Sequence, residues 1–351
     1  MENTDVLIVG AGATGLYLSN LLKKHHIAHR VIDAKAGPSG HSRSIGIHPA
    51  CFDLMEEIGV MDAIRRDAVS VRQGQAWTAR RRLGVLPLGE VLTLSQHRTE
   101  AILEAGAAPV EYGVRFLGYT HEGERLRVST SEGEITCHTV LGCDGMHSAV
   151  RGAMGVAGEV VAYPYEFFMA DMRDTTGFGS DAAIFLHPDG MTESFPLSDG
   201  QRRWVVMRRG DESPDLDGLL REIRLRTGHE PDPSTHTMFS AFKAYRHIAP
   251  ILTDKNVFLV GDAAHVTSPI GGQGMNLGWL NARDLIRHWD DPSTYERLAK
   301  ARANRVIERA EFNMRLGGKS RMHRVRATGV YLALHSPLKR WLSRRFTMRD
   351  L

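Results

Sequence analysis

The chain has 351 residues, of which 42% are hydrophobic and 24% are charged. This length favours two domains, and the composition excludes a disordered chain, a collagen-like repeat and a disulfide scaffold. The net charge is only +3, which indicates no polyanionic partner such as a nucleic acid. The 35 glycines exceed the usual share of ~7% and gather in a few loops.

The first predicted element is a buried strand over residues 5–9 that leads into a helix with leucines at helical spacing. Between them lie the glycines of a Gly-x-Gly-x-x-Gly pattern: Gly10, Gly12 and Gly15. They allow a tight turn, close approach of a pyrophosphate to the backbone, and close packing of helix on strand. A second strand ends at Asp33, 18 residues after Gly15 and near the ~20 expected for a ribose-binding carboxylate. This arrangement predicts a dinucleotide site, and Asp33 suits FAD and NAD equally.

Two later loops repeat the pattern of a buried strand that ends beside an acid. In one, the strand 140–142 runs into Asp144 and a helix that carries Arg151. In the other, the strand 257–260 runs into Asp262, and a glycine-dense loop opens a helix from about Met275. Glycines leave room for a flat ring against the backbone, and a helix N-terminus stabilises negative charge on that ring.

In this order and spacing, the three motifs resemble the para-hydroxybenzoate hydroxylase-like (group A) family of FAD-dependent aromatic monooxygenases. Residues 261–265 and 269–276 form the most specific part of the resemblance. Residues 42–49 are similar to the family's segment whose arginine contacts the flavin, and residues 96–103 resemble its Gln-x-x-x-Glu-x-x-Leu helix. The similarity covers about residues 4–335.

The resemblance implies an FAD site and assigns its residues by position. The residues expected at the ADP half are Gly10, Gly12, Gly15 and Asp33. Those expected at the ribityl and pyrophosphate region are Arg43, Gln96 and Asp262. Asp144 with Arg151 would serve both FAD and transient contact with NADH or NADPH. The residues expected to face the isoalloxazine are Pro269, Gly271, Gly272, Gly274, Met275 and Asn276.

Between the motifs, residues 163–245 are interpreted as alternating strands, and residues 69–88 as a hairpin of the same sheet. The predicted fold class is α/β: a Rossmann-like FAD-binding domain with an interleaved antiparallel β-sheet substrate domain and C-terminal helices. We place the FAD-binding domain at 1–68, 92–162 and 246–351, and the substrate domain at 69–91 and 163–245.

The inner face of this second sheet would roof the flavin and contact the substrate. The candidates for substrate contact are Phe167, Met169, Phe185, Phe195, Met207 and Ser268. Three further residues, none of them a certain catalytic group, are candidates for facing the flavin: Pro269, His48 and His265. The competing interpretation of each aromatic residue and methionine is core packing, and that of each histidine is a structural role. The 17 histidines show no metal-ligand spacing, so no metal is predicted.

The resemblance implies a monooxygenase. NADH or NADPH would reduce FAD, the reduced flavin would react with O2 to give a C4a-hydroperoxide, and one oxygen atom would pass to an aromatic or polycyclic small molecule. The protein would position the substrate and exclude water. Two alternatives remain open: a flavin dehydrogenase or reductase acting on an isoprenoid or quinone-like substrate, and a non-catalytic binding module.

The C-terminal end is basic. Residues 315–351 hold ten lysines and arginines against one acid, a net charge of +9, so the preceding 314 residues sum to −6. Residues 330–346 predict an amphipathic basic helix, interpreted either as a solvated face or as peripheral contact with an anionic membrane surface. Three cysteines, an acidic N-terminus and the lack of an apolar run of about 18 residues predict a cytoplasmic protein without a signal peptide or transmembrane helix.

Overall fold

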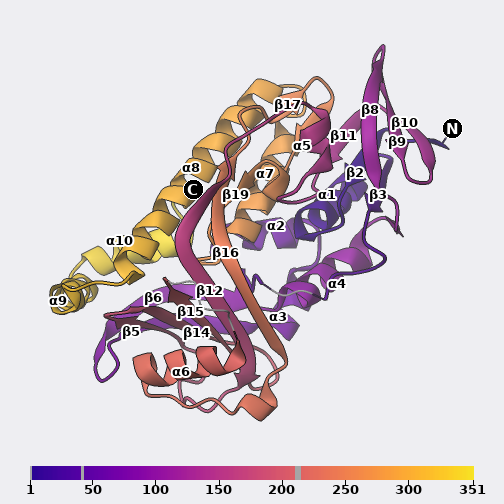
Figure 1. Ribbon diagram of the computed structural model, residues 1–351. Coiled ribbons are helices and arrows are strands. Elements are labelled where there is room, and N and C mark those ends of the chain that lie inside the picture. Colours follow the sequence, from indigo (N-terminus) through magenta and orange to yellow (C-terminus); the bar gives the residue numbers. More distant parts are fainter. Residues whose placement is uncertain (1, 41–42, 210–214) are drawn as a thin grey trace.

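The computed structural model describes residues 2–40, 43–209 and 215–351, and these form three sheets flanked by helices (Figure 1). The first is a parallel sheet that carries the three motif loops. In spatial order its strands are β17 (Thr253–Asp254), β18 (Val257–Leu259), β11 (Thr139–Gly142), β2 (Val6–Val9), β3 (His29–Asp33) and β7 (Val110–Tyr112). All neighbouring strands run parallel except β17, which pairs antiparallel with β18.

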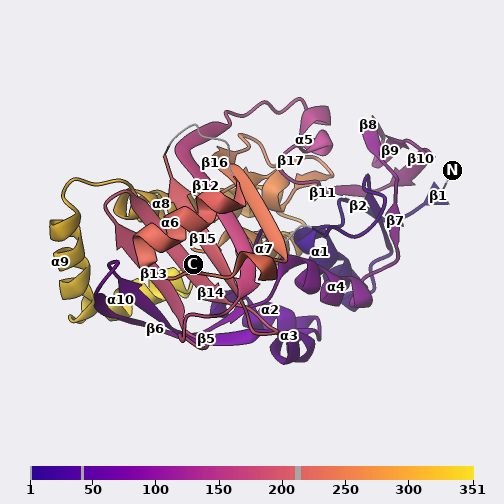
Figure 2. The ribbon, with the colours of Figure 1, turned by 60° about the horizontal axis from the view of Figure 1, so that its bottom comes forward.

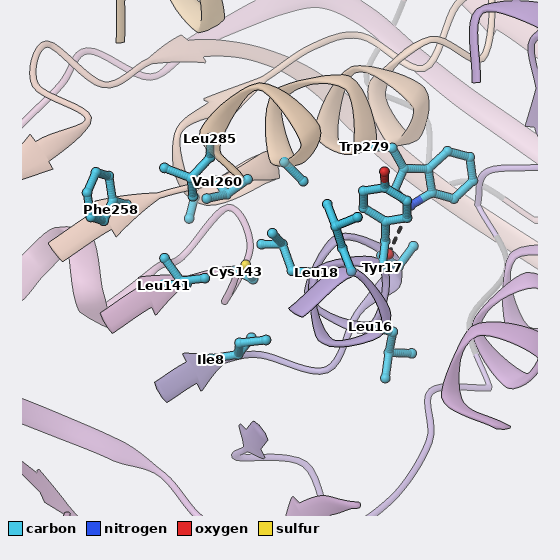
Figure 3. Close-up of a cluster of buried hydrophobic side chains, with 14 of the residues drawn as sticks. Ile8, Leu16, Tyr17, Leu18, Leu141, Cys143, Phe258, Val260, Trp279 and Leu285 are labelled. Atoms are coloured by element: carbon cyan, nitrogen blue, oxygen red, sulfur yellow. Dashed lines mark hydrogen bonds between the residues drawn. The ribbon is translucent and has the colours of Figure 1, made fainter. Parts of the chain in front are cut away.

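Helices and a small, mainly antiparallel sheet pack against the parallel sheet, which explains why its strands are continuous apolar runs. All residues of β2 and β11 are buried, for example. The covering helices include α1 (Ala13–Lys24), α4 (Gln96–Gly106), α7 (Gly274–Arg287) and α8 (Pro292–Gly317). Figure 3 shows Trp279 of α7 beside Tyr17 of α1, and the Trp279 Nε1 donates a hydrogen bond to the Ala13 carbonyl oxygen at 2.9 Å. This contact joins the first motif helix to the third.

The second sheet, named the substrate sheet here, is mainly antiparallel; β13 and β5 are its parallel pair. Its strands, in spatial order, are β19 (His265–Val266), β16 (Met238–Ile248), β12 (Val161–Arg173), β15 (Gln201–Arg208), β14 (Gly190–Pro196), β13 (Ala182–His187), β5 (Val69–Trp77), β6 (Arg82–Thr93) and β4 (Gly46–Ile47). Both predicted pieces of the substrate domain therefore contribute strands to one sheet. The exact division of the chain into two domains stays a prediction.

The two faces of the substrate sheet pack against different parts of the molecule. On the outer face lies α6 (Leu216–Thr227), which crosses the strands in Figure 2. On the inner face, side chains of β12 and β15 pack against Ile270 of the glycine-rich loop and against Ala310 and Met314 of α8. The inner face is thus the one turned toward the third motif.

The remaining elements frame these two sheets. A small sheet consists of β1 (Glu2–Asn3), β10 (Gly133–Cys137), β9 (Arg125–Thr130) and β8 (Phe116–Glu122). The shorter helices are α2 (Phe52–Glu57), α3 (Met61–Asp67), α5 (Ala149–Ala153), α9 (His323–Leu334) and α10 (Leu338–Phe346), with 3-10 turns at Pro49–Cys51, Pro233–Thr235 and Gly261–Ala263. In the part of the chain described, no helix combines the length and apolar character that crossing a membrane requires.

Two sequence-based expectations were wrong. The prediction of strands alone between 163 and 245 missed α6, although Asp215 caps its N-terminus and Gly228, at φ 75°, ends it in the left-handed region. Apolar residues on one face of α6 pack on the outer face of the sheet. The single basic helix predicted over 330–346 is two helices, α9 and α10. Pro337, the N-cap of α10, separates the two because proline lacks the backbone N–H that a continuing helix needs.

Candidate functional site

The first motif turns as tightly as the sequence predicts. Gly10 has φ 107°, and a Cβ added there would lie 2.5 Å from the Cys143 carbonyl oxygen of the second motif. A Cβ on Gly15 would collide with the Gly10 carbonyl oxygen. Gly12 faces open space instead, because the nearest atom to a Cβ there is Glu100 Oε1 at 4.0 Å. Gly10 and Gly15 therefore hold strand, helix and neighbouring loop together, and Gly12 leaves its backbone accessible.

Asp33, at the end of β3, is buried and binds backbone amides on two sides. Its Oδ2 accepts a hydrogen bond from Ala11 N at 2.8 Å, and its Oδ1 accepts one from Lys35 N at 2.8 Å. Each carboxylate oxygen keeps a further lone pair. Asp33 thus fixes the glycine-rich turn and still presents acceptor capacity beside it.

Glu100 of α4 is a site residue to which the sequence analysis assigned no role. Its Oε1 accepts hydrogen bonds from Ala13 N at 3.3 Å and from Gln96 Nε2 at 2.9 Å, and burial raises the pKa of the carboxyl. The Gln96 Oε1 in turn accepts a hydrogen bond from Ser44 N at 3.2 Å. The signal was present, because residues 96 and 100 lie one helical turn apart and share a face.

Arg43 is exposed, and its guanidinium lies 5.2 Å from the ring centre of Phe242. Its carbonyl oxygen accepts a hydrogen bond from Arg203 Nη1 at 3.0 Å. Ser42, which opens this predicted segment, lies outside the described residues. Arg43, in the segment that is expected to contact the flavin, is therefore hydrogen-bonded to the inner face of the substrate sheet.

Asp144 and Arg151 of the second motif are engaged by the protein itself. Asp144 accepts hydrogen bonds from the Ser148 hydroxyl at 2.5 Å and from Ala149 N at 2.7 Å, so it caps the start of α5. Arg151 donates to the carbonyl oxygens of Met146 at 2.6 Å and Ala263 at 2.8 Å. Arg151 thereby ties the second motif loop to the third.

Asp262 differs from the other two motif acids. The residue is exposed at the surface, while desolvation by the protein packed around it raises the pKa of the carboxyl to about 6. Within the described residues, no hydrogen bond or ion pair of this carboxylate is present. The backbone beside it is confined, since a Cβ on Gly261, where φ is 64°, would lie 2.7 Å from Thr14 Oγ1 of α1. Asp262 thus offers an acceptor at the junction of the first and third motifs.

Among the helices of the described residues, α5, α6 and α8 have a side-chain cap on the N-terminus, whereas α1 and α7, like α2, α3, α4, α9 and α10, have none. Ser148, Asp215 and Asp291 each accept a hydrogen bond from a first-turn amide of α5, α6 and α8, respectively. In the described part of the chain, α1 and α7 have no such side-chain cap on their N-cap residues, Gly12 and Gln273. Amide donors left uncapped at a helix start are suited to an anionic group.

His48 and Asn276 shape the loop on which the ring is expected. Asn276 accepts a hydrogen bond from His48 N at 2.8 Å and donates to the carbonyl oxygens of Gly46 at 2.8 Å and Gly272 at 3.0 Å. The His48 Nε2 donates to the Gly271 carbonyl oxygen at 3.0 Å, and burial lowers the pKa of this imidazole to about 4. The neutral ring then leaves Nδ1 as an acceptor, which is buried without a partner among the described residues.

The loop residues differ in accessibility. Gly271 is buried, at φ 85°, whereas Gly272, at φ 62°, and Gly274 are half-buried at the start of α7. Met275 and Pro269 are also half-buried, and Ser268 is buried. A Cβ on Gly272 would be in ordinary contact with Gly46 and His48, at 3.8 Å, so a side chain there is limited by the backbone φ rather than by a collision.

His265 lies in a buried network on the far side of this loop. Asn281 Nδ2 donates to His265 Nε2 at 2.6 Å, and Arg302 donates to Asn281 Oδ1 at 2.8 Å. Burial lowers the pKa of His265 to about 4. These contacts tie His265, on the edge strand β19 of the substrate sheet, to α7 and α8, and its place beside the flavin stays a prediction.

The structure separates the predicted substrate residues into three groups. Phe167, Met169 and Met207 lie together on the inner face with Ile270. Phe195 lies on the same face of the sheet but packs in a separate, smaller cluster with residues of β5 and β6. Phe185 was wrongly placed on the inner face. The residues before and after it in β13, Ile184 and Leu186, point inward. Because side chains alternate along a strand, Phe185 points outward, where it packs with Trp204 under α6.

The C-terminal segment also reaches this loop, which the sequence analysis did not predict. Gln273 Nε2 donates to the Phe346 carbonyl oxygen at 3.2 Å, and the Phe346 ring lies edge-on to His48 with centres 5.8 Å apart. The buried Arg309 of α8 pairs with Asp350 at 2.8 Å. The end of α10 is thereby seated against the glycine-rich loop.

These residues fit FAD. The backbone at Gly12, where a side chain is absent, suits a pyrophosphate at the start of α1, and Asp33 retains acceptors for ribose hydroxyls. The exposed Asp262 carboxylate suits a ribityl hydroxyl, and the uncapped start of α7 suits negative charge on the ring. Within the described residues, no three His, Cys, Asp or Glu side chains converge as a metal site requires.

A family profile described as FAD binding domain matches residues 3–289 of the chain. The chain belongs to this FAD-binding family. The match confirms the cofactor expected from the motifs and the resemblance to group A flavin monooxygenases. The chain is 29% identical over 303 residues to rifampicin monooxygenase from Streptomyces venezuelae, an alignment that covers 80% of this chain and 63% of that protein. It spans less than two thirds of the length of the curated relatives it matches.

Solved structures of a monooxygenase and a hydroxylase share the fold of this FAD-binding family member. The p-nitrophenol 4-monooxygenase of Pseudomonas putida superposes with a TM-score of 0.85 at 19% identity, covering 100% of this chain and 98% of that one. The anhydrotetracycline hydroxylase of Streptomyces rimosus superposes with a TM-score of 0.79 at 25% identity, covering 99% and 76%. The predicted fold class, a Rossmann-like FAD-binding part with an antiparallel sheet beside it, is confirmed.

Proposed function

We propose that this chain is an FAD-dependent monooxygenase that uses NADH or NADPH and O2 to hydroxylate an aromatic or polycyclic small molecule. The observation that carries the proposal is the placement of the glycine-rich loop 269–274 between the uncapped start of α7 and the inner face of the substrate sheet. A ring held on that loop lies under a largely apolar surface. Such a surface suits an aromatic substrate and keeps water away.

When bound, FAD supplies the electron transfer from the nicotinamide and the activation of O2. The residues of the chain hold and orient it: Asp33 at the ribose, Asp262 at the ribityl chain, and the backbone of Gly272 against the ring. The start of α7 favours negative charge on the reduced ring. Asp144 and Arg151 support the site indirectly, since their hydrogen bonds hold the second and third motif loops together.

The substrate class follows from the inner face and from the relatives. Phe167, Met169 and Met207 form an apolar wall opposite Ile270. The matched relatives and solved structures are named for action on rifampicin, p-nitrophenol and anhydrotetracycline, which supports a phenolic or polycyclic substrate. Pro269 and Ser268, at the edge of the loop, are proposed to contact that substrate.

The test is oxygen transfer. Purified protein that retains FAD is mixed with NADPH or NADH and a panel of phenols under 18O2, and products are analysed by mass spectrometry. We expect substrate-stimulated consumption of the nicotinamide and one 18O atom in the product. Substrate reduction or oxidation without 18O would support a dehydrogenase or reductase instead. A protein that binds no FAD would contradict the proposal and favour a binding module.

A further inference from the structure

We propose that Glu193, on the central strand β14, is the group that binds the hydroxyl of a phenolic substrate. This inference rests on the proposed hydroxylase function and specifies the substrate class: a neutral ring that bears a hydroxyl rather than a carboxylate at this point. No sequence motif marks Glu193.

The position of Glu193 follows from the strand register. It pairs with Ile184 of β13 and with Val205 of β15, and both neighbours belong to the inner-face cluster that includes Ile270 of the glycine-rich loop. Alternation along β14 puts Met191 on the same face and Thr192 on the other. Glu193 therefore lies in the middle of an apolar surface turned toward the place where the ring is held.

The surroundings of Glu193 give its carboxylate no partner. The residue is only 6% exposed, the described residues provide it with no hydrogen bond or ion pair, and its oxygens are not among the fully buried unpaired atoms, so they keep some access to solvent. On the same face of the sheet, Asp171 and Arg203 bind each other through two hydrogen bonds of 2.7 Å. A buried carboxylate without a partner is costly, so it indicates a ligand or a reaction that uses it.

The chemistry of the proposed reaction provides such a use. Oxygen transfer to a ring is favoured when the ring is rich in electrons, and a phenol becomes richer as its hydroxyl donates a hydrogen bond or its proton. The proton would move from the phenol oxygen to a Glu193 oxygen, which leaves a phenolate beside a carboxylic acid. Burial raises the pKa of Glu193 to about 7, nearer than an ordinary glutamate to the ~10 of a phenol.

The experiment compares two probes on the FAD-loaded protein. Binding of p-cresol and of its methyl ether, 4-methylanisole, is measured by titration of the flavin absorbance and fluorescence. In the unmodified protein we expect the phenol to bind roughly tenfold or more tightly than the ether, because only the phenol donates to the carboxylate. In Glu193→Gln that preference should shrink about tenfold, whereas affinity for the ether should change little.

Two further variants separate a binding role from a structural one. Glu193→Leu fills the apolar face, so it should raise the midpoint of thermal unfolding while abolishing the preference for the phenol. Glu166→Gln removes a carboxylate from the same sheet that pairs with Lys243 at 3.5 Å, and it should leave the preference unchanged. FAD content and circular dichroism check that each variant is folded.

The outcomes distinguish this proposal from the proposed function. An equal preference for phenol over ether in the unmodified protein and in Glu193→Gln would overturn the role of Glu193, even if 18O enters a product. Failure of the unmodified protein to prefer the phenol would overturn it as well. If the preference depends on Glu193 but no 18O is incorporated, the phenol site stands and the monooxygenase function falls.

Discussion

The parallel sheet and the substrate sheet place their polar groups in different ways. In the parallel sheet, Asp33, Asp144 and Asp262 lie at or just beyond strand ends, where loops bring backbone amides and glycines together. In the substrate sheet, Asp171, Arg203 and Glu193 lie within strands and on one face. In the first arrangement, backbone groups bind the cofactor, and few positions of the loops have room for a larger side chain. In the second arrangement, side chains form the surface, so a substitution changes one contact without changing the backbone.

The largest effect is expected where the parallel sheet allows no side chain. Gly15→Val would force atoms into the Gly10 carbonyl, which lies in the fixed backbone of the turn. We expect a loss of roughly 5 kcal/mol or more, in the extreme range for a single substitution. Urea unfolding, soluble yield and FAD content measure it.

A matched control is Gly118→Val, because Gly118 lies in β8 with no atom within 4 Å of an added Cβ. That variant should change the free energy of unfolding by less than about 1 kcal/mol. Comparable losses in both variants would contradict the view that the first motif is confined by its own backbone.

The next effect tests the charged pair of the substrate sheet. Asp171→Ala leaves the buried Arg203 guanidinium without its carboxylate, which should cost about 3–5 kcal/mol in the free energy of unfolding. The exposed pair of Arg224 and Glu230, 2.9 Å apart, offers the contrast. Glu230→Ala should cost less than about 1 kcal/mol. Denaturant unfolding of the flavin-loaded proteins decides whether burial makes this difference.

A smaller effect is expected from the titration of Glu193. Its pKa of about 7 in the folded protein exceeds the ~4.3 of an unfolded glutamate, so the folded state holds the proton more tightly. The free energy of unfolding should therefore fall as the pH rises from roughly 4.5 to 7. Asp262, with its pKa near 6, contributes in an overlapping window, so the measurement is a difference between variants.

The difference between unmodified protein and Glu193→Gln isolates the glutamate. Unfolding of both at closely spaced pH values should show a shallower fall in the glutamine variant, by an amount up to a few kcal/mol at ~1.4 kcal/mol per pKa unit. Identical slopes would show that Glu193 is already ionised or solvated, and would weaken its assignment to an apolar face.

The smallest effect concerns cofactor affinity. Asp262→Ala should weaken FAD binding roughly tenfold, since it removes one charged hydrogen-bond acceptor while the backbone contacts of the other motifs remain. Fluorescence titration of the flavin-free protein with FAD measures the dissociation constant. Asp217→Ala, an exposed change on α6 across the substrate sheet, should leave that constant unchanged. If Asp217→Ala lost as much affinity for FAD as Asp262→Ala, the loss in Asp262→Ala would not come from a contact with the cofactor.

The sequence by itself determined the cofactor half of the molecule. The local backbone of the turn requires Gly10, Gly15 and Asp33, so the spacing of these residues was enough to predict their positions in the fold. The position of Asp262 was predicted for the same reason, because it follows a buried strand directly. The predicted fold class rested on these loops and on the alternation of the later strands.

Tertiary structure decided the other half. The sequence could not separate Phe167 from Phe185, or single out Glu193, because the inward face of a strand depends on its register with strands distant in the chain. The contacts of Glu100 and of the α10 end depend likewise on segments distant from the motifs they meet. Short sequence motifs determine the local backbone, whereas the pairing of strands distant in the chain determines which side chains lie on the inner face of a sheet.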